Sequence, residues 1–378
     1  MQFMSQAMGI ADCILLAVAP IGAITTVVSA IRVAGPAWLK SFIGRARENL
    51  SAAEIEVMSS TSDETCELWN GHSVVRCPGS ADIYQFICLL PKGSNLKSLI
   101  INVYQQHASN YTSKEMCVVV DRFDDSAPNL LLNCHDRVQR GEIYLAAAFG
   151  VILQLGALVY FGFITYNPPI KGQFFLKDGK RIVDYAFPCA AGGTVLLMLG
   201  LFICAWVVER STTETCYEAP NHQMFVVWLQ KDHTVNDQVF KPYAIYPTSK
   251  RRYITRSRRN TKRPGQQEES KKNMTNVPIV GDKTSTTRDN NAAQEPIWDQ
   301  RLERITFFGA LIALIGFISQ FIGMRGLNWT ASVVQLAITF VVTMIRVIVR
   351  RGLGKSPIGR DLLLNTELDW FSLTLGDL

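Results

Sequence analysis

Side chains able to do acid–base or metal chemistry are sparse in this chain of 378 residues. Its five histidines are His72, His107, His135, His222 and His233. The sequence holds no HExxH pair. Cys134, His135 and Asp136 make only half of a metal or nucleophile site, because no further ligand follows at a fixed spacing. The histidines therefore predict neither a metal centre nor a catalytic nucleophile.

The acidic residues lead to the same expectation. Asp121, Asp124 and Asp125 would suit a hard cation, but they lack the ligand spacing of an EF-hand loop. We therefore expect a protein that is not an enzyme and that carries no catalytic residue, no cofactor and no metal. If the chain were nevertheless an intramembrane enzyme, His72, His107 and Asp121 would be the first residues to test.

Three glutamines lie inside long apolar segments, at Gln154, Gln320 and Gln335. Pumps and coupled transporters usually bury Asp, Glu or His to carry protons or ions, and these segments hold no such residue at their centres. Two interpretations stay open. The glutamines form hydrogen bonds between helices, or they line an intramembrane polar path for a substrate.

The net charge of +6 is concentrated in one segment, since residues 250–272 hold ten basic side chains against two acidic ones. The rest of the chain is not basic enough to indicate a nucleic-acid partner. The cluster at 250–263 is either a solvated tether or a site for anionic lipid. Its candidate lipid-binding residues are Lys250, Arg251, Arg252, Arg256, Arg258 and Arg259.

Five apolar segments must position these residues: 13–33, 143–164, 188–208, 305–323 and 329–349. The bilayer core needs about 20 apolar residues in a helix, and none of the five segments carries an acidic residue or a histidine. The sequence predicts an integral membrane protein with an all-α bundle of five transmembrane helices. A small cytosolic α+β domain and a disordered basic loop complete the predicted fold.

The predicted layout follows from the segments between the spans. Residues 1–34 hold the N-terminus and the first span, and 35–142 hold an interfacial amphipathic helix over 37–58 and the small α+β domain. Residues 143–208 are spans two and three with a short outer loop. Residues 209–304 are a cytosolic loop, disordered and basic from about 248, and 305–349 and 350–378 are the last two spans and a cytosolic tail. Predicted strands lie at 73–76, 83–90, 99–104, 116–120, 130–132, 224–229 and 238–246.

Lysine and arginine counts near the span ends predict the orientation. With the N-terminus outside and the C-terminus in the cytosol, thirteen basic residues flank the spans on the inside and five on the outside. The five are Lys171, Lys177, Lys180, Arg181 and Arg325. The two large loops, 34–142 and 209–304, would then be cytosolic, and the glycosylation acceptors Asn49, Asn110 and Asn273 would stay unmodified.

Several segments resemble a family of fungal multipass membrane proteins whose function is uncharacterised. They are APIGAITTVVSAIRV (19–33), GRAREN (44–49), EIEVMSSTS (54–62), CELWNG (66–71), DYAFP (184–188), DQVF (237–240), QFIGMRGL (320–327) and ELDW (367–370). The resemblance implies no catalytic residue that could be carried over. Some longer members carry ankyrin repeats, which implies a scaffold or signalling context, but this chain has no 33-residue period.

We therefore expect a non-enzymatic, membrane-anchored interaction, sensing or scaffold protein of fungal cells, in the plasma membrane or an endomembrane. Its partners are the lipid bilayer and proteins that the sequence does not identify. The alternative is a transporter or channel component, serving for example metabolite export. The SSTS segment before CELWNG predicts a helix end that runs into a strand, with its hydroxyls satisfying backbone groups.

Overall fold

The computed structural model describes residues 9–91, 117–121, 127–134, 140–166, 182–218, 222–248, 250–251, 253–260, 300–351 and 356–374. Within these ranges, four helices are long and apolar enough to cross a membrane. They are α7 (Arg140–Tyr166), α8 (Ala186–Arg210), α10 (Gln300–Gly326) and α11 (Trp329–Val349). Large apolar side chains such as Leu145 and Leu336 stand exposed on their outer faces, as lipid contact requires. The chain is thus compatible with a multipass membrane protein.

The predicted first span at 13–33 is wrong, because two short helices replace it. They are α1 (Ile10–Val18) and α2 (Ala23–Ala34), and neither is long enough to cross a bilayer. The break lies at Pro20, which lacks a backbone N–H, and at Gly22, whose φ of 89° is left-handed. The bundle therefore has four candidate spans instead of five.

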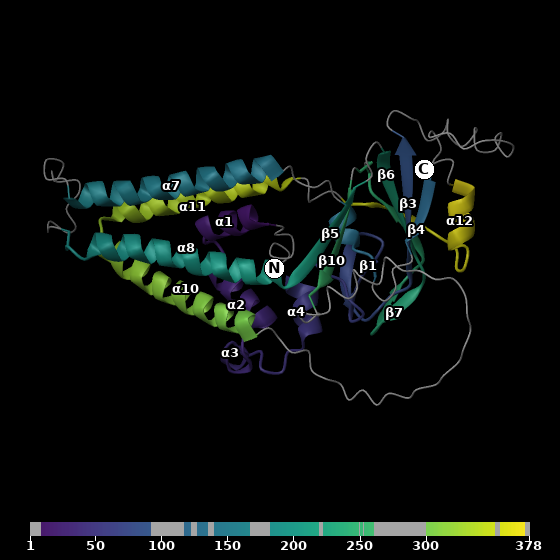
Figure 1. Cartoon of the computed structure of the whole chain (residues 1–378), viewed down its shortest axis with the longest axis horizontal. Coiled ribbons are helices and arrows are strands. Elements are labelled where there is room, and N and C mark those ends of the chain that lie inside the picture. Colours follow the sequence, from purple (N-terminus) through teal and green to yellow (C-terminus); the bar gives the residue numbers. More distant parts are fainter. Residues whose placement is uncertain are drawn as a thin grey trace, which may run out of the picture.

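Helices α1 and α2 form a hairpin that enters the bundle and leaves it at the same end (Figure 1). Near its start, Asp12 forms an ion pair with Arg350, which follows α11. At its tip, the Val18 carbonyl accepts a hydrogen bond of 2.9 Å from Gln154, midway along α7. Helix α2 then returns, and Val33 packs near the last residues of α8. We call residues 10–34 the hairpin.

The same geometry places both ends of the hairpin relative to the strands. The ion pair between Asp12 and Arg350 holds the start of the hairpin at the end of the bundle where α11 finishes. That end also carries the strand-containing domain, because α8 runs directly into a strand there (Figure 1). We call it the domain end. The two ends of the hairpin therefore lie at the same end of the bundle, whereas the ends of a full crossing would lie at opposite ends.

The spans pair into two antiparallel couples, with the hairpin between them (Figure 1). Helices α8 and α10 approach most closely, through glycines spaced seven residues apart. A Cβ built on Gly193 would lie 2.1 Å from the Gln320 backbone nitrogen, and one on Gly323 would lie 2.1 Å from that of Ala190. This is the close backbone contact that small residues allow in membranes. Helix α7 pairs with α11 on the other side of the hairpin.

One antiparallel sheet joins both large loops and the tail. Its strand order is β11-β9-β6-β3-β4. The strands are β3 (Ile83–Pro91), β4 (Cys117–Asp121), β6 (His222–Gln230), β9 (Tyr243–Tyr246) and β11 (Ile358–Asp361). The predicted division into a domain at 35–142, a separate loop at 209–304 and a tail at 350–378 is therefore replaced by one composite domain. We call it the strand domain.

Among the described residues, three two-stranded sheets and three short helices complete the strand domain. The sheets pair β1 (Thr65–Trp69) with β2 (Val74–Pro78), β5 (Thr212–Glu218) with β10 (Tyr253–Arg259), and β7 (His233–Val235) with β8 (Gln238–Phe240). The helices are α4 (Leu50–Val57), α6 (Leu130–Cys134) and α12 (Glu367–Thr374), whereas α3 (Ala37–Phe42) lies beside α2 and α10 (Figure 1). The buried indole of Trp228 donates a 2.8 Å hydrogen bond to Gln85 across the main sheet. On α12, Phe371 stacks on Phe86 of β3.

Several local predictions need correction here. The single amphipathic helix at 37–58 is split into α3 and α4, because Gly44 takes a left-handed φ of 75° and Asn49 caps the start of α4. The strand predicted at 130–132 is helix α6. Strand β10 lies inside the segment predicted to be disordered, where pairing with β5 orders it. The strand predicted at 99–104 and the remainder of the predicted disorder, 261–295, lie outside the described residues.

Candidate functional site at the junction of hairpin and strand domain

Arg32, in the last turn of α2, connects the hairpin to the strand domain. Only 1% of its side chain is exposed. Its guanidinium contacts Glu48 at 2.5 Å and Glu56, on α4, at 2.6 Å. The Arg32 Nε also donates to both Glu48 oxygens, at 3.1 and 3.0 Å. Charge-assisted contacts of this fork geometry are strong and directional, so the position of α2 fixes that of α4.

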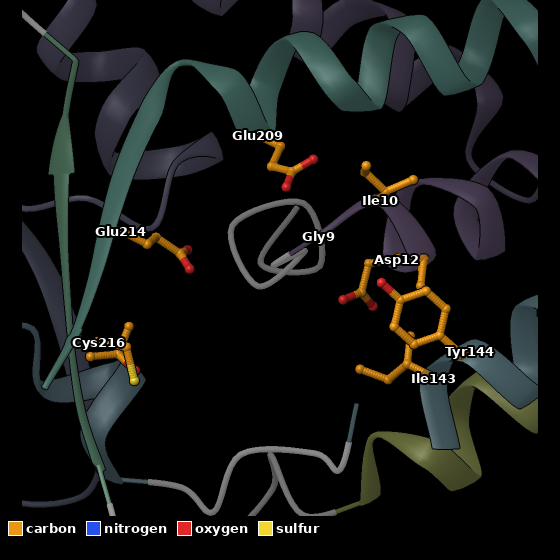
Figure 2. Close-up of a pocket in the computed structure, with 10 residues that line it drawn as sticks. Gly9, Ile10, Asp12, Ile143, Tyr144, Glu209, Glu214 and Cys216 are labelled. Carbon is orange, nitrogen blue, oxygen red and sulfur yellow. The ribbon is translucent and has the colours of Figure 1, made fainter. Parts of the chain in front are cut away.

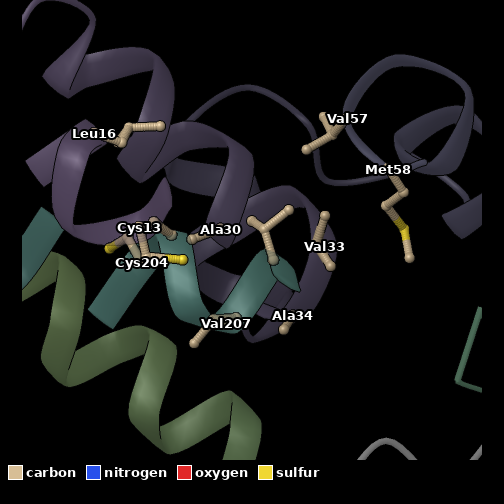
Figure 3. Close-up of a cluster of buried hydrophobic side chains, with 11 residues drawn as sticks. Cys13, Leu16, Ala30, Val33, Ala34, Val57, Met58, Cys204 and Val207 are labelled. Atoms are coloured by element: carbon tan, nitrogen blue, oxygen red, sulfur yellow. The ribbon is translucent and has the colours of Figure 1, made fainter. Parts of the chain in front are cut away.

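A shared apolar core includes Val33 and Val57, the chain neighbours of Arg32 and Glu56 (Figure 3). It takes Cys13 and Leu16 from α1 and Ala30 and Val33 from α2. Helix α8 adds Cys204, Ala205, Val207 and Val208, and the strand domain adds Val57 and Met58. Because hairpin, bundle and strand domain bury side chains against one another here, none of the three can shift without repacking the others. We call this region the junction.

A buried carboxylate organises the next layer of the junction. Glu54 of α4 is fully buried and accepts hydrogen bonds from Ser60 at 2.7 Å and Ser62 at 2.9 Å. Arg259 of β10 pairs with the same carboxylate at 3.0 Å. The SSTS segment does lead from helix α4 into strand β1, as predicted. However, two of its hydroxyls satisfy a side-chain carboxylate instead of backbone groups, whereas Thr61 donates to the Ala127 carbonyl.

The predicted lipid-binding cluster does not lie on one open face. Arg259 is paired with Glu54 and Glu64, and Arg251 is buried, with its backbone bridged to Met224. Arg256 and Arg258 lie on β10, and Lys250 is exposed beside Arg251. Arg252 and residues 261–263 lie outside the described ranges. Lipid binding by this cluster remains a prediction.

The three intramembrane glutamines do not converge. Gln335 donates to the Gln154 side chain at 3.3 Å, and Gln154 donates to the hairpin tip. Gln320 instead donates to Thr194 at 3.0 Å, between α10 and α8. The first two therefore hold the tip of the hairpin, and the third holds the close helix pair. The polar contacts agree with hydrogen bonding between helices and give no continuous path through the three residues.

A cavity of about 400 Å³ opens where the hairpin, α8 and β5 meet (Figure 2). The carboxylates of Asp12, Glu209 and Glu214 point into it from these three elements. Asp12 is already paired with Arg350, and Glu209 accepts a 3.4 Å hydrogen bond from the Cys13 thiol. The cavity has an acidic lining, but its carboxylates contribute to the packing of the domain end.

Several titratable groups among the described residues of the strand domain are buried. Burial raises the pKa of the Cys66 thiol to about 12 and that of Cys88 to about 11, so both stay protonated at neutral pH. Burial also raises the pKa of Glu67, against the opposing charge of Arg76. Across the described ranges, no group of three or more His, Cys, Asp or Glu is placed to hold a metal ion.

The predicted enzyme candidates are only partly placed. His72 follows β1 in an exposed turn, and Asp121 ends β4 on the far edge of the main sheet. His107, His135, Asp124, Asp125 and Asp136 lie outside the described residues. Sequence reasoning missed Arg32 and Glu54 as the organising residues. The sequence did hold a signal for them. Arg32 lies at the end of an apolar run, and Glu54 and Glu56 alternate on the short helix that follows.

Comparison of the chain with protein-family models, with curated proteins and with solved structures found no match.

Proposed function

We propose that this chain is a non-enzymatic multipass membrane protein that acts as a membrane-anchored interaction or sensing protein. The proposal follows the family resemblance, which also suggests a fungal cell. The contact of Arg32 with Glu48 and Glu56 carries the argument. Since this contact ties a hairpin inside the bundle to helix α4, a change in the bundle would alter the surface of the strand domain.

We further propose that the strand domain faces the cytosol. The segment 1–12 holds no Lys or Arg, so moving it to the domain end leaves the count of basic flanking residues unchanged at thirteen against five. The positive-inside rule then favours a cytosolic domain end. In this orientation the N-terminal segment and the C-terminal tail are both cytosolic, which revises the N-out expectation.

Proximity labelling from a tag after residue 378 tests the interaction role. The wild-type chain should label a reproducible set of neighbours that Arg32→Gln changes. Arg45→Gln is the matched control, because Arg45 also contacts Glu48 but is 49% exposed. A neighbour set identical to that of a fusion holding the four spans alone would contradict an interaction role for the strand domain.

One observation favours the alternative of a transporter or channel component. A helix broken at mid-bundle is how many transporters expose backbone groups near the membrane centre. The hairpin tip has this form, and the Gln335 Oε1 beside it is buried without a hydrogen-bond partner. Flux of small metabolites into proteoliposomes, abolished by Gln154→Leu, would favour transport over interaction.

A further inference from the structure

A second cavity lies on the outside of the bundle, between the hairpin and α10. It is a groove of about 540 Å³, and every side chain lining it is apolar. Its walls include Ile24 and Val28 of α2 and Phe307 and Phe317 of α10, and Trp38 and Phe42 of α3 close one end. This volume lies within the ~300–1,000 Å³ typical of small-ligand sites. We call it the lateral groove.

The lateral groove runs from mid-bundle to the domain end and opens sideways. At its deep end, Ala23 packs in the cluster of Leu197 and Ala313, near the middle of α8 and α10. At its outer end, the Trp38 ring meets Phe307 edge-on, with ring centres 5.5 Å apart. Tryptophan is typical of the membrane–water interface. Ile24 is 79% exposed and Phe42 86% exposed, so these walls face the bilayer directly.

The outer end of the lateral groove carries positive charge. Lys40 of α3 lies between the lining residues Leu39 and Phe42. Arg301 and Arg304 lie in the first two turns of α10, before Phe307, and the acidic neighbours of Lys40 are Glu303 and Glu48. Since Arg32 already pairs with Glu48, the basic residues at this end outnumber the remaining acidic residue, which favours an anionic group there.

We infer that the lateral groove binds an acyl chain of an anionic phospholipid, with the headgroup at Lys40 and Arg304. The groove opens toward the bilayer. A phospholipid has an apolar chain and a charged headgroup, which match the apolar walls of the groove and the basic residues at its outer end. A helix of a second copy does not fit, because a helix about 10 Å wide would fill 540 Å³ within little more than one turn. This site is distinct from the basic cluster at 250–263.

Native mass spectrometry of the full chain in detergent tests the inference. The protein is titrated with phosphatidylserine and phosphatidylcholine of identical acyl chains. We expect one tightly retained lipid per chain, with phosphatidylserine bound about fivefold more tightly for each basic residue engaged. Lys40→Gln and Arg304→Gln should each reduce this preference while leaving one lipid bound.

A bulky side chain that fills the lateral groove distinguishes a lipid bound in the groove from lipid bound elsewhere on the bundle. Ala310 lines the groove on α10, so Ala310→Trp should abolish the retained lipid. Ala337→Trp is the matched control, because Ala337 is exposed on α11 outside the groove, and it should retain the lipid. Circular dichroism of both variants verifies that the helices remain folded.

Four outcomes would overturn the inference. They are equal retention of the two lipids, a retained lipid in folded Ala310→Trp, co-purification of an apolar molecule that is not a lipid, and a dimer disrupted by Ala310→Trp alone.

Discussion

At the scale of single residues, Arg32 and Glu54 determine how the strand domain meets the bundle. Each is a charged group that is almost completely buried, and each is paired and hydrogen-bonded on several sides. Removing one partner of such a pair leaves an uncompensated buried charge, which is far more costly than losing a surface ion pair. The junction should therefore respond sharply to substitutions at these two positions.

Arg32→Ala is expected to lower the unfolding free energy by about 3–5 kcal/mol, because the buried Glu48 would keep only the half-exposed Arg45 as its partner. Arg45→Ala should cost only about 0–1 kcal/mol, since Arg45 is half exposed. Denaturant unfolding in detergent micelles measures both. Equal effects for the two substitutions would mean that the contact of Arg32 does not hold the junction.

Glu67 predicts a pH effect inside the strand domain. Burial raises its pKa in the folded state above the ordinary value of 4.5, with Arg76 and Cys134 as charged or titratable neighbours. The folded state thus binds the proton more tightly than the unfolded state. The contribution of Glu67 to stability is complete at low pH and is lost as pH rises through the folded pKa.

The comparison of wild type with Glu67→Gln isolates this effect. The stability of the wild type relative to the variant should fall as the pH rises from about 4 to 8. Thermal unfolding across that range measures it. A difference between the two proteins that stays constant with pH, or rises, would contradict the assignment.

At the scale of elements, four spans were predictable because each is a continuous apolar run of sufficient length. The hairpin was not predictable from the same signal, since hydropathy counts apolar residues and does not report chain direction. Proline and glycine, as at Pro20 and Gly22, also occur within continuous transmembrane helices, where neighbouring helices satisfy the freed backbone groups. What defines the hairpin is tertiary: Asp12 finds Arg350 at one end, and Gln154 binds the Val18 carbonyl at the tip.

The contact between α8 and α10 depends on which face a glycine occupies. A side chain at Gly193 would collide with the backbone at Gln320, whereas one at Gly192 would meet nothing within 4 Å. Gly193→Ala should therefore destabilise the bundle by about 1–3 kcal/mol and Gly192→Ala should not. Thermal unfolding in micelles compares them. Similar behaviour of the two variants would contradict the close contact. The sequence indicated small residues in this helix, but it could not show which of the two glycines faces α10.

At the scale of the whole molecule, most of the strand domain lay beyond sequence analysis. Strands such as β3 and β6 were recognisable from their composition, but Phe86 pairs with Val227 across two membrane spans. Pairing at that separation is set by the bundle, which brings both loops and the tail to one end. Tertiary contacts also order β10. Its arginines make the segment polar, which predicted disorder, but Arg259 pairs with Glu54 and the strand pairs with β5.

The lateral groove and the junction share helix α2, which lines the groove between Ile24 and Ile31 and carries Arg32 in its last turn. A lipid in the groove would thus lie one turn from the ion pairs that hold α4. If the protein is a sensor, bilayer composition is the signal that this arrangement is best placed to transmit to the strand domain.

The central claim is that the hairpin re-enters the bundle and leaves it at the domain end. The most direct measurement is protease accessibility of epitope tags placed before Met1 and after Leu378, in sealed membrane vesicles of one orientation. The account predicts that both tags are cleaved together in vesicles with the cytosolic face outward and are protected together in the inverse preparation. Cleavage of one tag with protection of the other would contradict it, because that result requires an odd number of crossings.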